Sequence, residues 1–421
     1  MDKRFFNIFG LTEAEAIAIL QAPIEATKDD TDRYVAASQL AYFPTPEAIS
    51  ALIETIDKDY PDRAHRIARR KAVESLGRLK AENGLASIRN CLQDEDCYTV
   101  ENAVWAIGEI GTEDEGILAE IAQLLDRPGQ VYRIIIQVLA KLNYKPALEK
   151  IKLFTKSETP SVVCAAIAAV CRLSEDYSQM NRVVEFLRHP NINARRGCIQ
   201  DLIDAKYYAA IPEIARSPVS VVFRLRGIKI LAESAITEEK LSFATIEPVL
   251  DRTICDRPQD LDLVYRFDPE RSLPDTINDL YHTDFGRCYA GSQIMIDAYG
   301  DAAPEALLKD FAERGYRDYG AHYHIVKLLG QLKYPPSYDL LREALHNTTP
   351  QYQKSRAAAA IALGNLEDKR AIPEIKKALN TRIWSLKYAC LLASEKLGCD
   401  REVKDILAAD SDLLIRAKIA T

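Results

Sequence analysis

The chain has 421 residues, of which 48% are hydrophobic and 28% are charged, so it can bury an extended core. Its formal net charge of −7 argues against a nucleic-acid-binding protein, which would usually carry a basic surface. No apolar stretch reaches the roughly 18 residues of a membrane span, and the first residues, Met1 to Phe6, do not resemble a signal peptide. Nine cysteines without a Cys-x-x-Cys pair indicate free, mostly buried thiols in a reducing cytoplasm.

One sequence phrase recurs along the chain: a basic or polar residue, an Ala-rich apolar run, a small residue and a Leu or Ile. Its copies end 31 or 32 residues apart in the first half, and 34 and then 31 residues apart in the second. Two helices of about twelve residues joined by short turns need about that length. The clearest copies are Arg69–Leu79, Glu101–Ile110, His322–Leu332, Arg356–Leu366 and Lys387–Leu397.

The first helix of each predicted pair is also visible, for example at Pro46–Ile53 and Ala371–Leu379, where apolar residues fall at helical spacing. The phrase is lost between residues 236 and 285, where Pro258, Pro269, Pro274 and many charges predict a long loop. Near the end, Leu413–Ala417 resembles a shortened repeat that would cap the array.

These patterns predict an all-α fold, a HEAT-like α-solenoid in which helical hairpins form a superhelix with a concave binding face. We expect N-terminal repeats over residues 1–235, an irregular insertion over 236–285 and C-terminal repeats over 286–421.

A ladder of polar residues is predicted on the concave face, because the second helix of each hairpin lines it. The position ten residues before the end of each copy is basic in several repeats, at Arg69, Arg195, His322, Arg356 and Lys387. Such a ladder could bind carboxylates, since Arg offers two parallel hydrogen bonds. The alternative is structural: each side chain caps a neighbouring turn or pairs with an Asp.

The segment from Arg314 to His324 is the richest in polar aromatic residues. If a helix begins near Asp318, then Asp318, Tyr319, His322 and Tyr323 are neighbours on its surface and could exchange protons near neutral pH. The alternative is that Asp318 caps the helix and the aromatic rings pack. His322 and His324 are two residues apart and point apart on a helix, so no metal site is predicted.

Several of these phrases resemble the short repeats of the phycobilin lyases of the E/F type. The resemblance extends from about Asp32 to Leu397. It is carried by Arg69–Leu79, Asn193–Gly197, Ala209–Ala215, Phe223–Lys229 and Ser355–Asp368, together with the central interruption and the Asp318–His322 segment. Because the chain is long and single, it is most similar to the phycoerythrin lyases and lyase-isomerases of cyanobacteria.

This resemblance implies an enzyme that attaches a linear tetrapyrrole, phycoerythrobilin, through a thioether to a cysteine of a phycoerythrin subunit. Isomerisation of the pigment to phycourobilin is a further expectation, although the Asn-His-Cys-Gln-Gly-Asn motif of one isomerising type is absent. The bilin is a substrate, so no permanent cofactor is expected. The residues we expect to carry acid–base chemistry are Asp318, Tyr319, His322 and Tyr323, and those we expect to bind the bilin are Arg317, His324, Arg356, Arg287, Arg224 and Trp384.

The incoming thiol belongs to the partner protein, so no cysteine of this chain is expected to be an essential nucleophile. The alternative function is a non-catalytic HEAT-repeat adaptor or chaperone that binds a protein on its concave face. Composition and periodicity do not separate the two functions, whereas the Arg314–His324 segment favours the enzyme.

Overall fold

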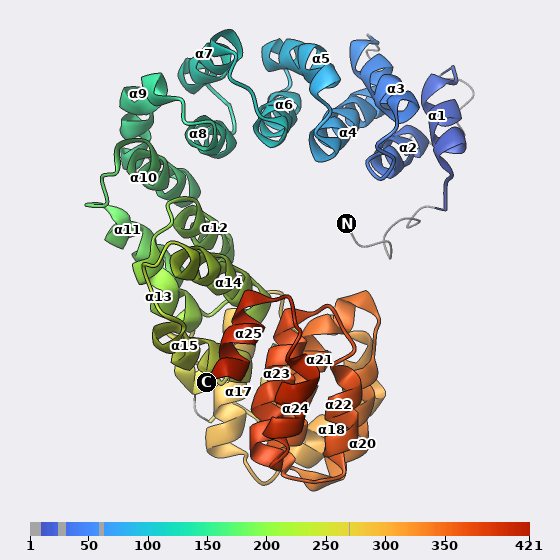
Figure 1. Cartoon of the computed structure of the whole chain (residues 1–421), viewed down its shortest axis with the longest axis vertical. Helices are drawn as coiled ribbons and strands as arrows, with labels where there is room; N and C mark the ends of the chain where they lie inside the picture. The colour runs from blue at the N-terminus through green and yellow to red at the C-terminus, as the bar shows by residue number, and fades with distance from the viewer. Residues whose placement is uncertain (1–9, 24–30, 59–62, 269) are drawn as a thin grey trace. The chain divides into compact units, whose positions relative to one another are not determined.

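The computed structural model describes residues 10–23, 31–58, 63–268 and 270–421 (Figure 1). In these residues the regular secondary structure is α-helix and 3₁₀-helix, with no β-strand. This confirms the predicted all-α solenoid. Contacts divide the chain after Gln179 into two compact units, whereas the sequence suggested divisions near residues 235 and 286.

The first unit is a row of helical hairpins. Its second helices contact one another in chain order, α2 with α4, α4 with α6, α6 with α8 and α8 with α10, as expected when each repeat touches its neighbours (Figure 1). Its helices are α1 (Glu13–Gln21), α2 (Asp32–Leu40), α3 (Pro46–Asp57), α4 (Arg63–Leu79), α5 (Leu85–Asn90), α6 (Cys97–Ile110), α7 (Glu115–Gln123), α8 (Tyr132–Lys141), α9 (Leu148–Leu153) and α10 (Pro160–Ser174).

The small residues of the repeated phrase let successive second helices approach closely. A Cβ atom on Gly77 in α4 would lie 2.8 Å from the Cα atom of Ala106 in α6. In the second unit, a Cβ atom on Gly364 would lie 2.8 Å from the Cα atom of Ala393. The recurring glycine therefore reflects close backbone packing between neighbouring repeats.

The second unit begins with the same hairpins and continues with helices around a buried centre. Its helices are α11 (Met180–Glu185), α12 (Ile192–Asp204), α13 (Ile211–Arg216), α14 (Val221–Thr237), α15 (Phe243–Cys255), α16 (Leu273–Asp279), α17 (Phe285–Ala298), α18 (Ala303–Glu313), α19 (Tyr319–Gln331), α20 (Tyr338–His346), α21 (Gln353–Leu366), α22 (Ala371–Ala378), α23 (Trp384–Leu397), α24 (Asp400–Leu407) and α25 (Leu413–Ala420).

The second unit closes on itself. Helices α14 and α15 contact α25, and α15 also contacts α21 and α23, although these partners lie far along the chain (Figure 1). The Tyr388 hydroxyl donates to Asp251 over 2.7 Å, and Lys418 lies 3.0 Å from the same carboxylate. Lys229 pairs with Asp412 at 2.6 Å. An open solenoid lacks such contacts, so these helices surround a shared interior.

The predicted irregular insertion contains two α-helices, α15 and α16. Between them, the described residues 256–268 and 270–272 form no α-helix. Two prolines that suggested a loop, Pro258 and Pro274, lie at helix starts, where a missing N–H group needs no partner. Pro269 lies outside the described residues. The Asp262 N–H donates to the Arg216 carbonyl over 2.8 Å, which fixes this segment beside α13.

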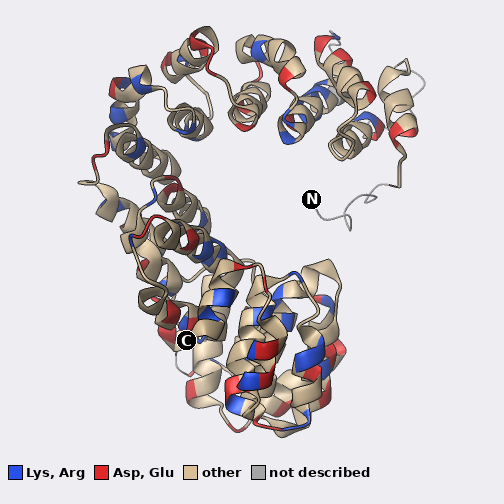
Figure 2. Cartoon of the chain, viewed as in Figure 1, with Lys and Arg blue, Asp and Glu red and all other residues tan. Residues whose placement is uncertain are grey.

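Acidic and basic residues are interspersed along the helices of both units (Figure 2). Within the described ranges, no helix combines the length and the apolar character needed to cross a membrane.

Candidate functional site

The predicted segment around Asp318 begins helix α19. The Asp318 carboxylate accepts the backbone N–H groups of Gly320 and Ala321, each over 2.8 Å. Asp318 therefore caps the start of α19, and one of its carboxylate oxygens is occupied by these two hydrogen bonds. Tyr319 is 56% exposed, whereas Tyr323, one turn further, is buried.

The two histidines of α19 point to different neighbours, as their spacing predicts. His322 packs against the rings of Phe311 and Tyr352, and His324 lies among Phe285, Tyr289 and Tyr323.

Burial lowers the pKa of His322 to about 4 and that of His324 well below 6.5. Both imidazoles are therefore neutral near pH 7, which argues against His322 as a proton donor and against His324 as a cation for a carboxylate. No group of three or more His, Cys, Asp or Glu residues that could hold a metal ion occurs in the described part of the chain.

Tyr323 belongs to a buried ionic cluster centred on Asp256, which follows α15. The Asp256 carboxylate accepts hydrogen bonds from Arg224, Tyr323, Tyr289 and Lys327, the last two at 3.0 and 3.2 Å. Burial opposes ionisation of Asp256, but the Lys327 and Arg224 cations outweigh it and lower the pKa of this carboxyl. The cluster joins α14, α15, α17 and α19.

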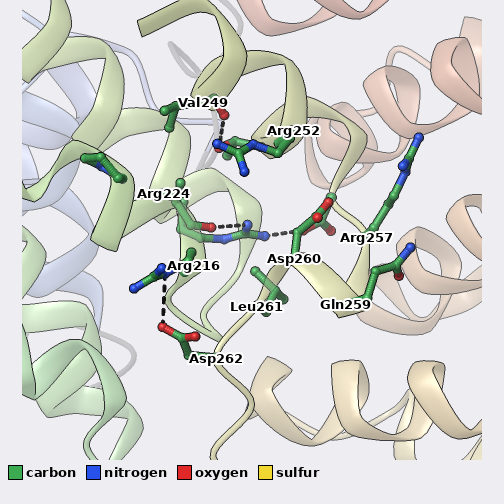
Figure 3. A pocket seen from close by; sticks show the side chains of 13 residues that line it. Arg216, Arg224, Val249, Arg252, Arg257, Gln259, Asp260, Leu261 and Asp262 are labelled. Carbon is green, nitrogen blue, oxygen red and sulfur yellow. Dashed lines mark hydrogen bonds and ion pairs between the residues drawn. The ribbon is translucent and has the colours of Figure 1, made fainter. Parts of the chain in front are cut away.

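Arg224 lines a cavity of about 280 Å³ beside α13 and α15, yet it is not free to bind an anion (Figure 3). Its Nε and Nη1 atoms donate to the carbonyls of Val219 and Ala215, and Nη2 donates to Asp256 and Tyr289. The Arg224 side chain is 1% exposed. The expectation that Arg224 binds the bilin is therefore corrected: it is a structural cation.

A second cavity, of about 270 Å³, lies where the second unit closes. We call it the apolar pocket. Helices α14, α15, α19 and α21 and the start of α23 line it, so it joins residues more than 160 positions apart. Its lining comprises Val221, Val222, Leu225, Arg226, Lys229, Ile230, Ile254, Tyr323, Gln353, Lys354, Ala357, Ala358, Ile383, Trp384 and Ser385.

The rim of the apolar pocket is also hydrophobic. Val222 is 51% exposed and Ile230 is 38% exposed, and both line the pocket from α14. The pocket therefore combines apolar walls, two large aromatic residues and a few cations, a composition typical of sites for planar organic molecules.

A polar cavity of about 560 Å³ adjoins the apolar pocket, since Lys229 and Trp384 line both. The Lys229 ammonium lies 4.9 Å from the centre of the Trp384 ring. Around the polar cavity, Lys387 pairs with Asp410, while Arg382 is exposed and has no ion pair with another described residue. The two cavities together offer an apolar compartment next to a charged one.

Lys354 is the most unusual residue of the apolar pocket. Its ammonium lies 4.2, 5.0 and 5.2 Å from the ring centres of Phe285, Tyr319 and Tyr323. Burial lowers the pKa of Lys354 to about 8. A lysine that is half protonated near pH 8 can both donate and accept a proton.

The other predicted bilin-binding residues are dispersed. Arg317 is exposed and lies over the Tyr316 ring, and Arg287 lies over Tyr265 and Phe267. Arg356 is 7% exposed, and its Nε atom donates to the Leu345 carbonyl over 2.9 Å. None of these three arginines lines the apolar pocket, because their guanidinium groups contact protein elsewhere. Among the predicted residues, only Tyr323 and Trp384 line it.

The basic residues predicted along the concave face, where their contacts are known, cap turns and pair with Asp residues. Arg69 donates to the Ile56 carbonyl over 3.0 Å and pairs with Asp94 at 2.5 Å. Arg195 donates to the carbonyls of His189 and Pro190 and pairs with Asp284 at 2.5 Å. These side chains stabilise turns rather than forming a continuous anion-binding surface.

Four pocket cations, Arg226, Lys229, Lys354 and Arg382, are absent from the set predicted by sequence. Lys354 is in the first turn of α21 and Arg382 lies two residues before α23, whereas Arg226 and Lys229 lie within α14. The sequence prediction considered one position of each repeat, ten residues before its end, and none of these four residues occupies that position.

All nine cysteines are free thiols, and seven of them are buried. Burial raises the pKa of Cys288 to about 12, and its thiol donates to the His282 carbonyl over 3.3 Å. Such a thiol is a poor nucleophile at neutral pH.

Comparisons with known proteins bear on this geometry. The chain matches HEAT repeats at residues 63–140 and the PBS lyase HEAT-like repeat at residues 32–58 and 355–381. It is 54% identical over 418 residues to the uncharacterized phycocyanin operon protein Y of Pseudanabaena tenuis (strain PCC 7409), with 99% of each chain covered. It is 30% identical to the bilin biosynthesis protein CpeY of Synechococcus sp. (strain WH8020), covering 87% of this chain and 90% of the relative.

The chain belongs to the HEAT-repeat bilin lyase family. Its fold agrees with a solved family structure, the complex of CpcE and CpcF of phycocyanin lyase from Nostoc sp. PCC7120. That match has a TM-score of 0.50 and 26% identity, and it covers 58% of this chain and 94% of the other. This bilin lyase homologue is therefore longer than the lyase chain it matches, whereas it aligns along most of CpeY.

Proposed function

We propose that this protein binds phycoerythrobilin in the apolar pocket and attaches it by a thioether to a cysteine of a phycoerythrin subunit. Family membership supports bilin lyase activity in general. The single observation that supports the site is an apolar pocket with Trp384 and Tyr323 in its walls, next to three cations, Arg226, Lys354 and Arg382, that have no carboxylate partner among the described residues. A linear tetrapyrrole has a long apolar conjugated system and two propionates, so it matches this combination.

Two exposed arginines are the proposed partners of the propionates. Arg226 lines the apolar pocket and donates to the Gln200 side chain over 2.8 Å, and Arg382 lines the polar cavity. Neither has an ion pair with a carboxylate among the described residues. They come from α14 and from the start of α23, so one bilin could bridge the two sides of the closed unit.

The choice of phycoerythrobilin and phycoerythrin rests on the length of the chain. The alignment with CpeY covers 87% of this chain, whereas the alignment with a phycocyanobilin lyase subunit alpha from Synechococcus elongatus covers only 54% of it. The other long relative is named for a phycocyanin operon, so phycocyanin subunits belong in the same assay.

Co-expression tests the proposed activity. The chain is produced in a bacterial host with enzymes that make phycoerythrobilin and with one phycoerythrin or phycocyanin subunit at a time. A phycoerythrin subunit is expected to keep its visible absorption after denaturation in acidic urea, and one cysteine peptide to gain the mass of the intact pigment. If no subunit gains more covalent colour with the chain than without it, lyase activity would be refuted and the adaptor alternative favoured.

The same assay tests isomerisation. Phycourobilin has the same mass as phycoerythrobilin but a shorter conjugated system, so isomerisation appears as blue-shifted absorption of the attached pigment without a mass change. We propose it as a second activity of the same site, because Lys354 places an exchangeable proton in the pocket, with the Tyr319 ring 5.0 Å from its ammonium.

Binding of the propionates has its own test. Replacing either arginine, Arg226→Gln or Arg382→Gln, should weaken phycoerythrobilin binding by about 10- to 100-fold, since a hydrogen bond to a charged group contributes roughly 1.5–3 kcal/mol. Arg401→Gln, an exposed arginine of α24 outside the apolar pocket, is the matched control. Titration of bilin absorption measures the affinity, and equal affinities in all three variants would contradict the proposed binding mode.

A further inference from the structure

Lys354 occupies a position that is unfavourable for a cation. It is the second residue of α21, where the helix macrodipole places partial positive charge. Its side chain is half-buried and faces the apolar pocket, so it also loses part of its hydration. Its own helix and its solvation therefore both oppose the charged form.

Aromatic rings partly replace the lost hydration. The faces of Phe285, Tyr319 and Tyr323 surround the ammonium at 4.2–5.2 Å. Each cation–π contact contributes on the order of 1 kcal/mol, less than a buried ion pair. Among the described residues, no hydrogen bond or ion pair involves Lys354. Its three N–H groups remain available to a molecule in the pocket.

Charged groups on the surrounding helices affect Lys354 with mixed sign. Asp256 after α15 and Asp318 at the start of α19 favour its protonated form, while Lys327 on α19 opposes it. The Cys288 thiol on α17 is uncharged near pH 8, since burial raises its pKa to about 12. The nearby His322 and His324 imidazoles are neutral at pH 7, since burial lowers the pKa of each.

Arg226 and Lys229 face the pocket from α14; Lys229 is paired with Glu233 and Asp412. Lys354 is therefore the titrating group of the apolar pocket near neutral pH.

We propose that Lys354 is the catalytic acid of bilin transfer, the residue that protonates the tetrapyrrole as the acceptor thiol adds; this inference rests on the proposed lyase function. The thiol sulfur forms a bond to the ethylidene carbon that is joined to the terminal ring by the double bond. The carbon–carbon double bond is lost, and the ring carbon that shared it receives a proton from the Lys354 ammonium. The thiol proton leaves with solvent and Lys354 is later reprotonated, so the net change is addition of R–SH without oxidation or reduction.

Other roles for Lys354 fit the pocket less well. A Schiff base needs an aldehyde or ketone, and a bilin has only lactam carbonyls and carboxyl groups. A propionate anchor would be better served by Arg226 and Arg382, which keep their charge at all relevant pH values. A lysine in an aromatic, desolvated position is instead suited to proton transfer, because its two protonation states are close in free energy near pH 8.

Two variants separate acid catalysis from binding. Lys354→Met keeps a long apolar side chain but has no ammonium proton to donate. Lys354→Arg keeps the positive charge but does not release a proton at neutral pH. Lys377→Met, an exposed lysine of α22 outside the apolar pocket, is the control. The full-length chain is preloaded with phycoerythrobilin and mixed with excess phycoerythrin subunit, and both bilin affinity and the single-turnover rate of covalent attachment are measured.

Both Lys354 variants should bind phycoerythrobilin within about threefold of the wild-type affinity, whereas attachment should slow by about 100- to 10,000-fold, the usual contribution of a general acid. The wild-type rate at each pH is divided by that of Lys354→Met, which cancels ionisation of the acceptor thiol. Because only the protonated amine is active, this ratio should fall as pH rises through about 8.

Several results would overturn the proposal. A Lys354→Met variant that attaches bilin within threefold of the wild-type rate would exclude acid catalysis by this residue. A variant that loses affinity, but whose bound pigment transfers at the wild-type rate, would make Lys354 an anchor. A wild-type chain that neither binds nor transfers the pigment would refute the proposed function itself, so failure of the broader proposal can be recognised separately.

Discussion

Replacing Asp256 with asparagine should destabilise the second unit while leaving its backbone geometry intact. Asp256 has a left-handed φ of +47°, a conformation that Asn tolerates well, so the change chiefly removes a negative charge. The charge is compensated by Arg224, which is 1% exposed, and Lys327, which is 4% exposed. Removing one partner from a buried ion pair costs about 3–5 kcal/mol. Because the asparagine oxygen can still accept from Tyr323 or Arg224, we expect the lower part of that range.

The assay follows urea unfolding of the second unit alone. The chain has two tryptophans, Trp105 in the first unit and Trp384 in the second, so a Trp105→Phe background confines the fluorescence to the second unit. Asp262→Asn is the matched control, since Asp262 forms partly exposed pairs with Arg188 and Arg216 that contribute at most about 1 kcal/mol.

The dependence on pH gives a second check. The folded state lowers the pKa of Asp256 below 3.8, so its stabilising effect is present above pH 3.8 and is lost as pH falls through the lower folded value. The stability difference between wild type and Asp256→Asn should therefore shrink in strong acid. A loss at pH 7 no larger than that of Asp262→Asn would refute the role given to the cluster.

Further changes test other parts of the account. Trp384→Ala should weaken phycoerythrobilin binding roughly tenfold in an absorption titration, while Trp384→Phe should retain most of the affinity, because a ring still lines the pocket; equal affinity in both would contradict this lining role. Cys255→Ser and Cys288→Ser should each leave bilin attachment to the acceptor subunit intact, and loss of attachment with retained bilin binding would show that this chain supplies a nucleophile. Gly364→Ala should lower the free energy of unfolding by about 1–3 kcal/mol in urea titration, because its Cβ atom would lie 2.8 Å from the Ala393 backbone; no change would mean that the repeats separate readily.

The solenoid could be predicted from the sequence because each repeat carries its own local pattern. The Ala-rich run and small residue of Arg69–Leu79 reappear in Arg356–Leu366, and their spacing follows from helix length alone. The closure of the second unit could not be predicted in this way. It depends on Tyr388 reaching Asp251 and on Lys229 reaching Asp412, contacts between residues 137 and 183 positions apart that no periodicity encodes.

The candidate site shows the same limit. Tyr323 and Trp384 were among the predicted residues, and both line the apolar pocket. His322 and Arg224 were chosen for their chemistry, but burial keeps the histidine neutral and four protein groups occupy the arginine. Lys354 was missed because its role depends on rings from α17 and α19 that surround it only after folding. Its place in the first turn of a helix, against the macrodipole, was the feature that could have identified it.

Tyr323 links the apolar pocket to the buried cluster around Asp256. The side chain of Tyr323 lines the pocket, while its hydroxyl donates to Asp256 in the buried cluster. The cluster thereby fixes one wall of the pocket, and burial together with the Asp256 charge holds the pKa of Tyr323 well above 10. Tyr323 therefore stays protonated near neutral pH and contributes only its ring to the pocket. Lys354, beside it, is the residue that gains or loses a proton.

The central claim is that this pocket holds a bilin and that the chain transfers it to a protein thiol. The most direct measurement is absorption of a phycoerythrin subunit in acidic urea after co-expression with the wild-type chain and enzymes that make phycoerythrobilin, alongside Trp384→Ala and Arg382→Gln. We expect a covalently coloured subunit with the wild-type chain and much weaker colour with either variant. A colourless subunit with the wild-type chain, or equal colour with all three chains, would contradict it.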